Sequence, residues 1–280
     1  MNPRALPYIL IAPSVIFLGA FFLYPFVLVA QLAFVDDGRW SLTNFQEVFD
    51  HWKFPISFWN TVLLAAVVVP VQLALALLMA TMVTGMKRGR DLVLYVWTIP
   101  LGISDLAAGI IWLAIFEQSG FLNSMLAGLG VERPANWLTY QNPGIVFLAI
   151  ALAEIWRATA IMLVILVAGM GLIPKEYYEA AEVFGASRWK RFTRITLPLL
   201  RPSLQTALVL RVILAFEVFA VVAALGGTLF PVLMGQVYEY QFDLLNAGGA
   251  AAIALVILAI SIVATLVILR ALRVPPGARV

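Results

Sequence analysis

Six long apolar runs dominate the chain, and shorter polar stretches separate them. The runs cover residues 8–34, 57–83, 92–116, 144–173, 204–225 and 249–269. Each run passes the roughly 20 residues that a helix needs to cross about 30 Å of hydrocarbon. None has the ten-residue alternation of a membrane barrel, so its backbone amides are best satisfied within a helix. The pattern predicts an all-α integral membrane protein with six transmembrane helices, the first too long for a signal peptide and therefore retained.

Composition supports this prediction and excludes several function classes. Of 280 residues, 63% are hydrophobic and only 12% are charged, whereas soluble domains have about 25% charged residues. The absence of cysteine excludes disulfides and thiol nucleophiles, and the single histidine, His51, excludes a multi-histidine zinc site. The basic residues lie beside the apolar runs rather than on a soluble face, so the net charge of +3 gives no reason to expect nucleic acid.

The basic residues instead indicate the orientation. Thirteen lie on one side of the predicted membrane: Arg4, Lys87, Arg88, Arg90, Lys175, Arg188, Lys190, Arg191, Arg194, Arg201, Arg270, Arg273 and Arg279. Arg39, Lys53 and Arg133 lie on the other side. The positive-inside rule then predicts that both termini are cytoplasmic and that residues 35–56, 117–143 and 226–248 form external loops.

The polar stretch 172–203, between the fourth and fifth runs, predicts two short helices joined as an elbow. One apolar stripe has helical spacing of i, i+3, i+4 and i+7: Tyr177, Ala180, Ala181 and Phe184. Gly185 is placed to end this helix, and Ser187 is placed to cap a second one. Pro198 and Pro202 are expected to break the chain before the fifth run.

This elbow resembles the EAA motif of binding-protein-dependent ABC importer permeases. Seven positions match that motif without a gap: Glu179, Ala180, Ala181, Gly185, Ile195, Leu197 and Pro198. From Asn60 to Arg270 the chain is also similar to the sugar-type permeases related to the maltose permease subunits. The resemblance implies the type I ABC importer permease fold, with a cytoplasmic coupling-helix elbow between helices four and five. It divides the chain into an N-terminal helix and external loop (1–56), a permease core of five helices (57–270) and a cytoplasmic tail (271–280).

The resemblance also implies a role for the elbow, which would fit a groove in a separate ATPase. Small residues permit close backbone approach, and Glu179 offers a carboxylate to a basic side chain of the partner. The predicted coupling residues are Tyr177, Glu179, Ala180, Ala181, Phe184 and Gly185. The alternative is an amphipathic helix that lies on anionic lipid.

The energy source is expected in other subunits. No GxxxxGK[ST] run occurs in the sequence, so the chain has no recognisable phosphate-binding loop. We therefore expect no enzyme activity and no cofactor in this chain, with ATP and magnesium on the partner. The resemblance implies a second homologous permease, two ATPase subunits, an extracytoplasmic solute-binding protein and a prokaryotic inner-membrane location, with lipid around the spans.

Charged residues inside the predicted spans indicate the solute path, because an unpaired charge in hydrocarbon costs at least about 2.5 kcal/mol. Five such residues occur: Asp105, Glu154, Arg157, Arg211 and Glu217. Glu154 and Arg157 are three apart and can pair along one helix face. Alignment through the motif to the related maltose permease gives the predicted path residues Glu154, Arg157, Ala158, Ile161, Leu210, Arg211, Ile213, Leu214 and Glu217. The alternative is that these charges only brace the helix bundle.

The predicted function is that of a permease subunit forming half of the translocation path for a sugar or sugar-like solute. Within the importer class, glycerol phosphate and polyols remain alternatives. An ion-coupled secondary carrier and a non-transporting membrane scaffold are the rivals from other classes.

Overall fold

Helices make up most of the chain, as its long apolar runs predict. The computed structural model describes residues 6–36, 38–131 and 136–273. Arg4, Arg133 and Arg279, which contribute to the orientation argument, and residues 274–280 of the predicted tail lie outside this part. The chain divides into two compact units, Met1–Pro55 with Leu233–Ala259, and Ile56–Val232 with Ile260–Val280.

The first unit begins with a long apolar helix and continues with short elements. Its elements are α1 (Leu6–Leu18), a π turn (Gly19–Leu23), α2 (Tyr24–Phe34), the hairpin strands β1 (Val35–Asp36) and β2 (Arg39–Trp40), α3 (Thr43–Asp50), α14 (Leu233–Tyr238), a second π turn (Glu239–Asp243) and the start of α15 (Ala247–Ala271). Asn44 ties α3 to the end of α2 by donating hydrogen bonds to the carbonyl oxygens of Leu32 and Ala33, both at 3.2 Å. Burial raises the pKa of the Tyr240 phenol, and nearby Glu239 and Glu47 add to this effect.

The predicted external loops 35–56 and 226–248 contain several of these short helices and strands, so parts of both loops have regular secondary structure.

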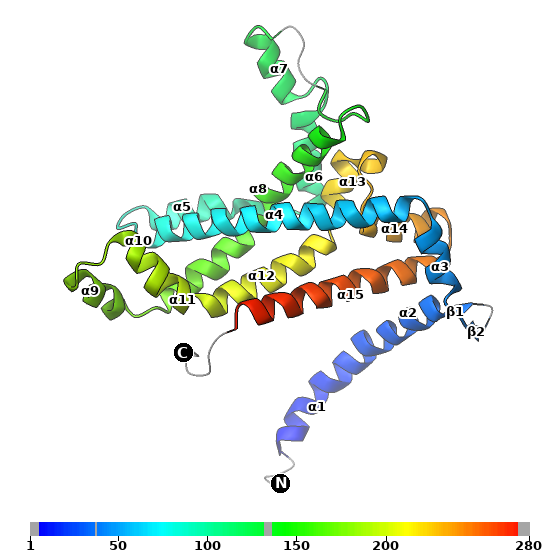
Figure 1. Cartoon of the computed structure of the whole chain (residues 1–280), viewed down its shortest axis with the longest axis horizontal. Coiled ribbons are helices and arrows are strands. Elements are labelled where there is room, and N and C mark those ends of the chain that lie inside the picture. The colour runs from blue at the N-terminus through cyan, green and yellow to red at the C-terminus, as the bar shows by residue number, and fades with distance from the viewer. Residues whose placement is uncertain (1–5, 37, 132–135, 274–280) are drawn as a thin grey trace. The chain divides into compact units, whose positions relative to one another are not determined.

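The second unit holds most of the apolar core. Its elements are α4 (Lys53–Thr84, from Ile56 on), α5 (Arg90–Thr98), a 3₁₀ turn (Ile99–Gly102), α6 (Asp105–Phe116), α7 (Phe121–Gly128), α8 (Pro143–Gly171), α9 (Lys175–Val183), α10 (Arg188–Arg191), a π turn (Phe192–Thr196), α11 (Leu197–Leu199), α12 (Arg201–Phe216), α13 (Ala220–Leu225), a 3₁₀ turn (Gly227–Leu229) and the end of α15. Helix α12 runs beside α8, and α13 packs on α6 (Figure 1).

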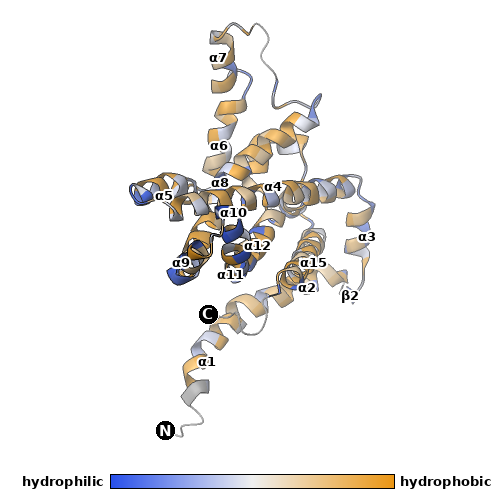
Figure 2. Cartoon of the chain, turned by 60° about the vertical axis from the view of Figure 1, so that its left-hand side comes forward, coloured by the Kyte–Doolittle hydropathy of each residue, from blue (hydrophilic) through white to orange (hydrophobic). Residues whose placement is uncertain are grey.

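Two buried clusters fill the spaces between these helices. One joins α4, α6, α8 and α13 around side chains such as Leu64, Ile150 and Val222. The other joins α4, α8 and α12 around Leu163 and Leu204. Apolar residues extend along α4 and α8, whereas α9 and α10 are largely hydrophilic (Figure 2). The elbow therefore contrasts with the helices that we expect to lie in the membrane.

Five helical segments in the described residues are long and apolar enough to cross a membrane, and a sixth is added if one bent pair counts as a span. The five are Tyr8–Phe34, Lys53–Thr84, Asp105–Gly128, Pro143–Gly171 and Ala247–Ala271, and the bent pair is Arg188–Leu199 with Arg201–Phe216, at 68°. The first predicted span is confirmed with the same ends, and the second, fourth and sixth are confirmed as helices with shifted ends.

The third predicted span, 92–116, is wrong as a single helix. Helix α5 ends at Thr98, the 3₁₀ turn carries Pro100 near its start, and α6 begins only at Asp105. Proline lacks the amide that would continue the helix, and the Ser104 hydroxyl accepts a hydrogen bond from the Ala107 amide to cap a new one. The candidate span here is Asp105–Gly128, so part of the predicted external loop 117–143 is helical.

The fifth predicted span, 204–225, is also interrupted. Helix α12 ends at Phe216, and Glu217, Val218 and Phe219 separate it from α13. At the other end, the chain bends at Leu200, immediately before α12 begins. Pro202 lies in the first turn of α12, as expected for a helix start, but Pro198 lies inside the preceding helical segment rather than at a break.

Candidate solute path and coupling surface

Four helices of the second unit bring charged and polar side chains together in an apolar surrounding. Helix α8 supplies Glu154 and Arg157, α12 supplies Arg211, α4 supplies Gln72, and α6 begins with Asp105. Glu154, Arg211 and Gln72 are almost completely buried. Because a buried charge is costly unless it is paired, the arrangement of partners decides whether this group is stable.

Glu154 lies between the two arginines and balances both. Arg211 donates from Nη2 to Glu154 Oε2 at 2.9 Å, and Arg157 donates from Nη2 to Glu154 Oε1 at 3.2 Å. Gln72 completes the buried side, since its Oε1 accepts from Arg211 Nε at 2.5 Å and its Nε2 donates to the Glu154 carbonyl oxygen at 2.7 Å. Helices α4, α8 and α12 are thus joined through one polar cluster.

On its other side, Arg157 reaches a second carboxylate. Its Nη1 donates to Asp105 Oδ1 at 2.6 Å, and this pair is more accessible than the Glu154–Arg211 pair. Asp105 stands in the first turn of α6, where the exposed amides of a helix N-terminus favour a negative charge. The cluster therefore runs from a buried end at Arg211 to a half-exposed end at Asp105.

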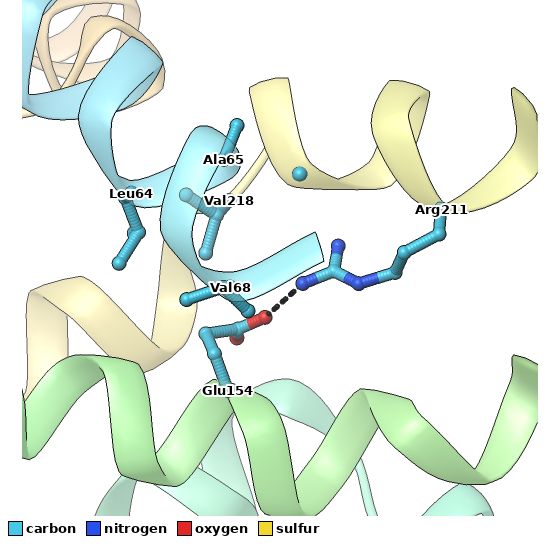
Figure 3. A pocket seen from close by; sticks show the side chains of 7 residues that line it. Leu64, Ala65, Val68, Glu154, Arg211 and Val218 are labelled. Carbon is cyan, nitrogen blue, oxygen red and sulfur yellow. Dashed lines mark hydrogen bonds and ion pairs between the residues drawn. The ribbon is translucent and has the colours of Figure 1, made fainter. Parts of the chain in front are cut away.

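A narrow crevice without room for a water molecule adjoins the buried end. Glu154 and Arg211 line it together with five apolar residues: Leu64, Ala65, Val68, Ala215 and Val218. Figure 3 shows the guanidinium of Arg211 extended toward the carboxylate of Glu154 beside these side chains. Arg211 Nη1 and Arg157 Nε are buried and make no hydrogen bond to the part of the chain that the structure describes.

The structure brings together some of the predicted path residues and separates others. Glu154, Arg157 and Arg211 form the cluster, with Ala158 buried and Ile161 half-buried on α8. On α12, Leu210 and Leu214 are exposed and Ile213 is half-buried. Glu217 follows the last residue of α12 and is exposed; its backbone amide donates to the Ile213 carbonyl oxygen, but its side chain makes no ion pair or hydrogen bond within the described residues. Its place in the path remains a prediction.

Sequence reasoning missed one member of this cluster and left another without a partner. Gln72 carries no charge, so a search for ionisable residues does not select it, although a glutamine inside a 32-residue apolar helix is itself a signal. Asp105 was recognised as a charge in a span but was not assigned to the path. Its contact with Arg157 joins residues 52 positions apart, and helical spacing cannot predict such a contact.

The elbow has the two helices that its sequence predicts. Helix α9 covers Lys175–Val183, Gly185 has φ of +70°, and the Ser187 hydroxyl accepts a hydrogen bond from the Lys190 amide at the start of α10. A left-handed φ favours glycine, which explains why the first helix ends there. The Tyr178 hydroxyl lies 3.1 Å from the Thr196 hydroxyl and ties α9 to the segment after α10.

The predicted coupling residues lie mostly on the outside of this elbow. Tyr177, Glu179, Ala180, Phe184 and Gly185 are exposed, and Ala181 is half-buried. The Phe184 side chain is 88% exposed, which is unusual for a large apolar residue outside the membrane. An exposed apolar surface of this kind is typical of a site that another protein covers.

Comparison with known proteins identifies the chain. The family described as binding-protein-dependent transport system inner membrane component matches residues 72–272. The chain belongs to this family. It is therefore a multi-pass inner-membrane permease of an ABC importer, a transport component rather than a catalyst, and it works with a solute-binding protein and an ATPase. Family membership sets aside the ion-coupled carrier and the membrane scaffold.

Several relatives match most of the chain. The sulfoquinovosyl glycerol transport system permease protein SmoG of Agrobacterium fabrum is 33% identical, with 98% of this chain and 92% of that protein covered. The trehalose/maltose permease protein MalF of Thermococcus litoralis is 33% identical, covering 79% and 77%. The sn-glycerol-3-phosphate permease protein UgpA of Yersinia pestis is 29% identical, covering 94% and 92%.

A solved structure supports the fold. The crystal structure of a bacterial ABC transporter involved in the import of the acidic polysaccharide alginate matches with a TM-score of 0.82 at 24% identity, over 98% of this chain and 97% of that one. The predicted all-helical membrane permease fold is thus confirmed. At this identity the match concerns the fold alone.

Proposed function

We propose that this permease forms half of the path for a sugar or sugar-like, uncharged solute. The observation that carries the proposal is the charge balance of the polar cluster, in which Glu154 and Asp105 offset Arg157 and Arg211. A polyhydroxylated solute needs both hydrogen-bond donors and acceptors, whereas a phosphate needs an excess of arginine or lysine. The name of MalF, a trehalose/maltose permease protein, supports the same class of solute.

Transport of glycerol phosphate is the second candidate, and the match to UgpA favours it. To bind an anionic solute, the path would need an arginine or lysine whose charge is not already neutralised by a carboxylate. In this chain both arginines of the cluster already contact carboxylates. The geometry of the cluster therefore favours the uncharged solute.

The rest of the assembly follows from the same proposal. A second homologous permease would supply the other half of the path, and two ATPase copies would bind ATP and magnesium. Tyr177, Glu179, Ala180, Ala181, Phe184 and Gly185 would form the surface that docks on one ATPase. In support of this role, the elbow is exposed, carries a carboxylate and large apolar side chains, and is held in shape by the Tyr178–Thr196 contact.

The test is purification of the native complex in mild detergent, followed by mass spectrometry of its subunits and of any bound solute. We expect a second permease, an ATPase, a binding protein and a neutral glycoside or oligosaccharide. Uptake by reconstituted complexes then compares that solute with sn-glycerol 3-phosphate. Preferred uptake of the phosphate would overturn the sugar proposal while leaving the family assignment intact.

A further inference from the structure

The charges of the polar cluster alternate in sign along a single line. Starting from the buried end, the order is Arg211, Glu154, Arg157 and Asp105, and each neighbouring pair is in contact. The exposed fraction of the side chains rises along this order, from 1% for both Arg211 and Glu154 to 17% for Arg157 and 52% for Asp105. The accessible end of the line is therefore a carboxylate.

This accessible carboxylate needs an aqueous or polar surrounding. Asp105 is the first residue of α6 and belongs to the candidate span Asp105–Gly128. A half-exposed carboxylate at the end of a span is costly in contact with lipid tails, so it faces water, headgroups, solute or a partner subunit. Its only described ion pair is with Arg157, through Nη1, whereas Glu154 contacts Nη2 of the same guanidinium.

The charge on Arg157 is thus shared between two carboxylates. If the Asp105 charge were removed, the guanidinium of Arg157 would be the outermost charged group of the cluster. Such a group attracts carboxylates, sulfonates and phosphates by charge-assisted hydrogen bonds. With Asp105 in place, an approaching anion meets a negative charge before it meets Arg157.

We propose that Asp105 is a specificity-determining residue, whose carboxylate neutralises Arg157 at the accessible end of the cluster and so excludes anionic solutes from the path. This inference rests on the proposed function, because it requires that the cluster lines the route of the solute. The inference names Asp105 as the residue that lets the path select solutes by charge. Neither helical spacing nor the family match indicates this role.

The wild-type chain has no cysteine, so the electrical potential beside Asp105 can be measured directly. Single cysteines are introduced at Ile161, one helical turn from Arg157, and at Leu106, the exposed neighbour of Asp105. Each variant is assembled with its partner subunits in nanodiscs. The probes are an anionic sulfonate and a cationic trimethylammonium methanethiosulfonate of similar size, and the measured quantity is the ratio of their reaction rates with the thiol.

Asp105→Asn removes the charge with almost no change in shape. We expect it to raise the ratio of anionic to cationic rates about tenfold, as expected for loss of a unit charge within roughly 8 Å. Arg157→Gln should lower the ratio, and the double variant should return it toward the wild-type value. That return would distinguish a charge effect from a distortion of the helices. Glu117→Gln is the matched control, since it removes a carboxylate just after the other end of α6.

Two results would overturn the inference, and only the second would also overturn the proposed function. If the reporters react in the assembled complex but Asp105→Asn leaves the ratio unchanged, Asp105 does not set the charge of the path, and the proposed function stands. If neither reporter reacts with either reagent, the cluster is closed to water, and the proposed path is wrong as well.

Discussion

At the residue scale, Glu154 has the properties of a brace more than those of a solute ligand. Its carboxylate is buried, both of its oxygens contact arginine, and its backbone carbonyl accepts from Gln72. A buried ion pair contributes little net stability when complete, but removal of one partner is strongly destabilising. We therefore expect the two interpretations of the charges, path and brace, to apply to different members of the same cluster.

This division leads to a prediction about stability. Glu154→Gln leaves Arg211 buried beside a neutral amide, so we expect the assembled complex to lose about 3 to 5 kcal/mol of unfolding free energy. Arg157→Gln should cost clearly less, because Arg157 is partly exposed and Glu154 keeps Arg211 as its partner. Thermal unfolding monitored by size-exclusion chromatography would compare the two variants.

The prediction fails if Arg157→Gln destabilises the complex as much as Glu154→Gln. Transport is scored separately, in variants shown to assemble. A loss of uptake in Arg157→Gln at nearly wild-type stability would support the path role of Arg157. Unchanged affinity and rate in the same variant would support the brace role for both residues.

The sequence predicts part of this cluster and omits part for a physical reason. The contact of Glu154 with Arg157 follows from a spacing of three in a helix, which places both side chains on one face. The contact of Arg211 with Glu154 joins two helices and needs their packing to be known. Alignment to the related maltose permease predicts Glu217 at the same cavity, but α12 ends just before it and no ion pair joins it to Arg211 within the described residues.

At the element scale, the contact of α8 with α12 depends on a small residue. A Cβ atom added to Gly169 would lie 2.1 Å from Ser203 Oγ and 2.6 Å from Ser203 Cβ. Helices in membranes often approach closely at glycine, since lipid gives no hydrophobic drive for their association. The Gly169 position lies near the end of α8, close to the chain that leads into the elbow.

We predict that Gly169→Ala destabilises the complex by about 1 to 3 kcal/mol, because the added methyl group forces α8 and α12 apart. Gly171→Ala is the matched control, as its Cβ would meet no atom within 4 Å. Melting temperatures of the two variants in the same detergent provide the measurement. Equal melting temperatures would show that the helices can adjust without cost.

The elbow gives a prediction about coupling. Glu179→Lys should leave the chain inserted and assembled, because Glu179 is exposed, but it should abolish solute-stimulated ATPase activity through like-charge repulsion at the docking surface. The measured quantity is ATP hydrolysis by reconstituted complexes, with and without loaded binding protein. Glu47→Lys reverses an equally exposed glutamate on the short helix α3 and is the control. Stimulated hydrolysis at the wild-type rate in Glu179→Lys would contradict the docking role.

Hydropathy located the helices of this chain better than their interruptions. Uniform apolar runs such as residues 143–171 give continuous helices because lipid leaves the backbone no other partner. The break before Asp105 has a visible cause in Pro100 and the Ser104 cap, yet the hydropathy of the run hides it. The break at residues 217–219 contains neither glycine nor proline, so the sequence gives no local signal for it; the segment that follows, α13, packs against α6.

At the scale of the whole molecule, the sequence predicts the orientation of the chain in the membrane, whereas the fold does not determine it. The third span moves from residues 92–116 to Asp105–Gly128. This shift transfers no lysine or arginine from one side of the membrane to the other, because none occurs between Asp91 and Gly128. The excess of thirteen basic residues over three therefore still predicts that both termini are cytoplasmic.

Single cysteines test this orientation on a chain that needs no prior cysteine removal. We predict that Gln46→Cys on α3 and Gln141→Cys before α8 react with a membrane-impermeant maleimide in intact cells, whereas Glu176→Cys on α9 reacts only after permeabilisation. All three positions are exposed in the chain, so accessibility differs by the side of the membrane and not by burial. If Glu176→Cys is labelled in intact cells while the other two are protected, the chain has the opposite orientation to the one predicted. The elbow would then lie on the side away from ATP, and it could not serve as the docking surface for an ATPase.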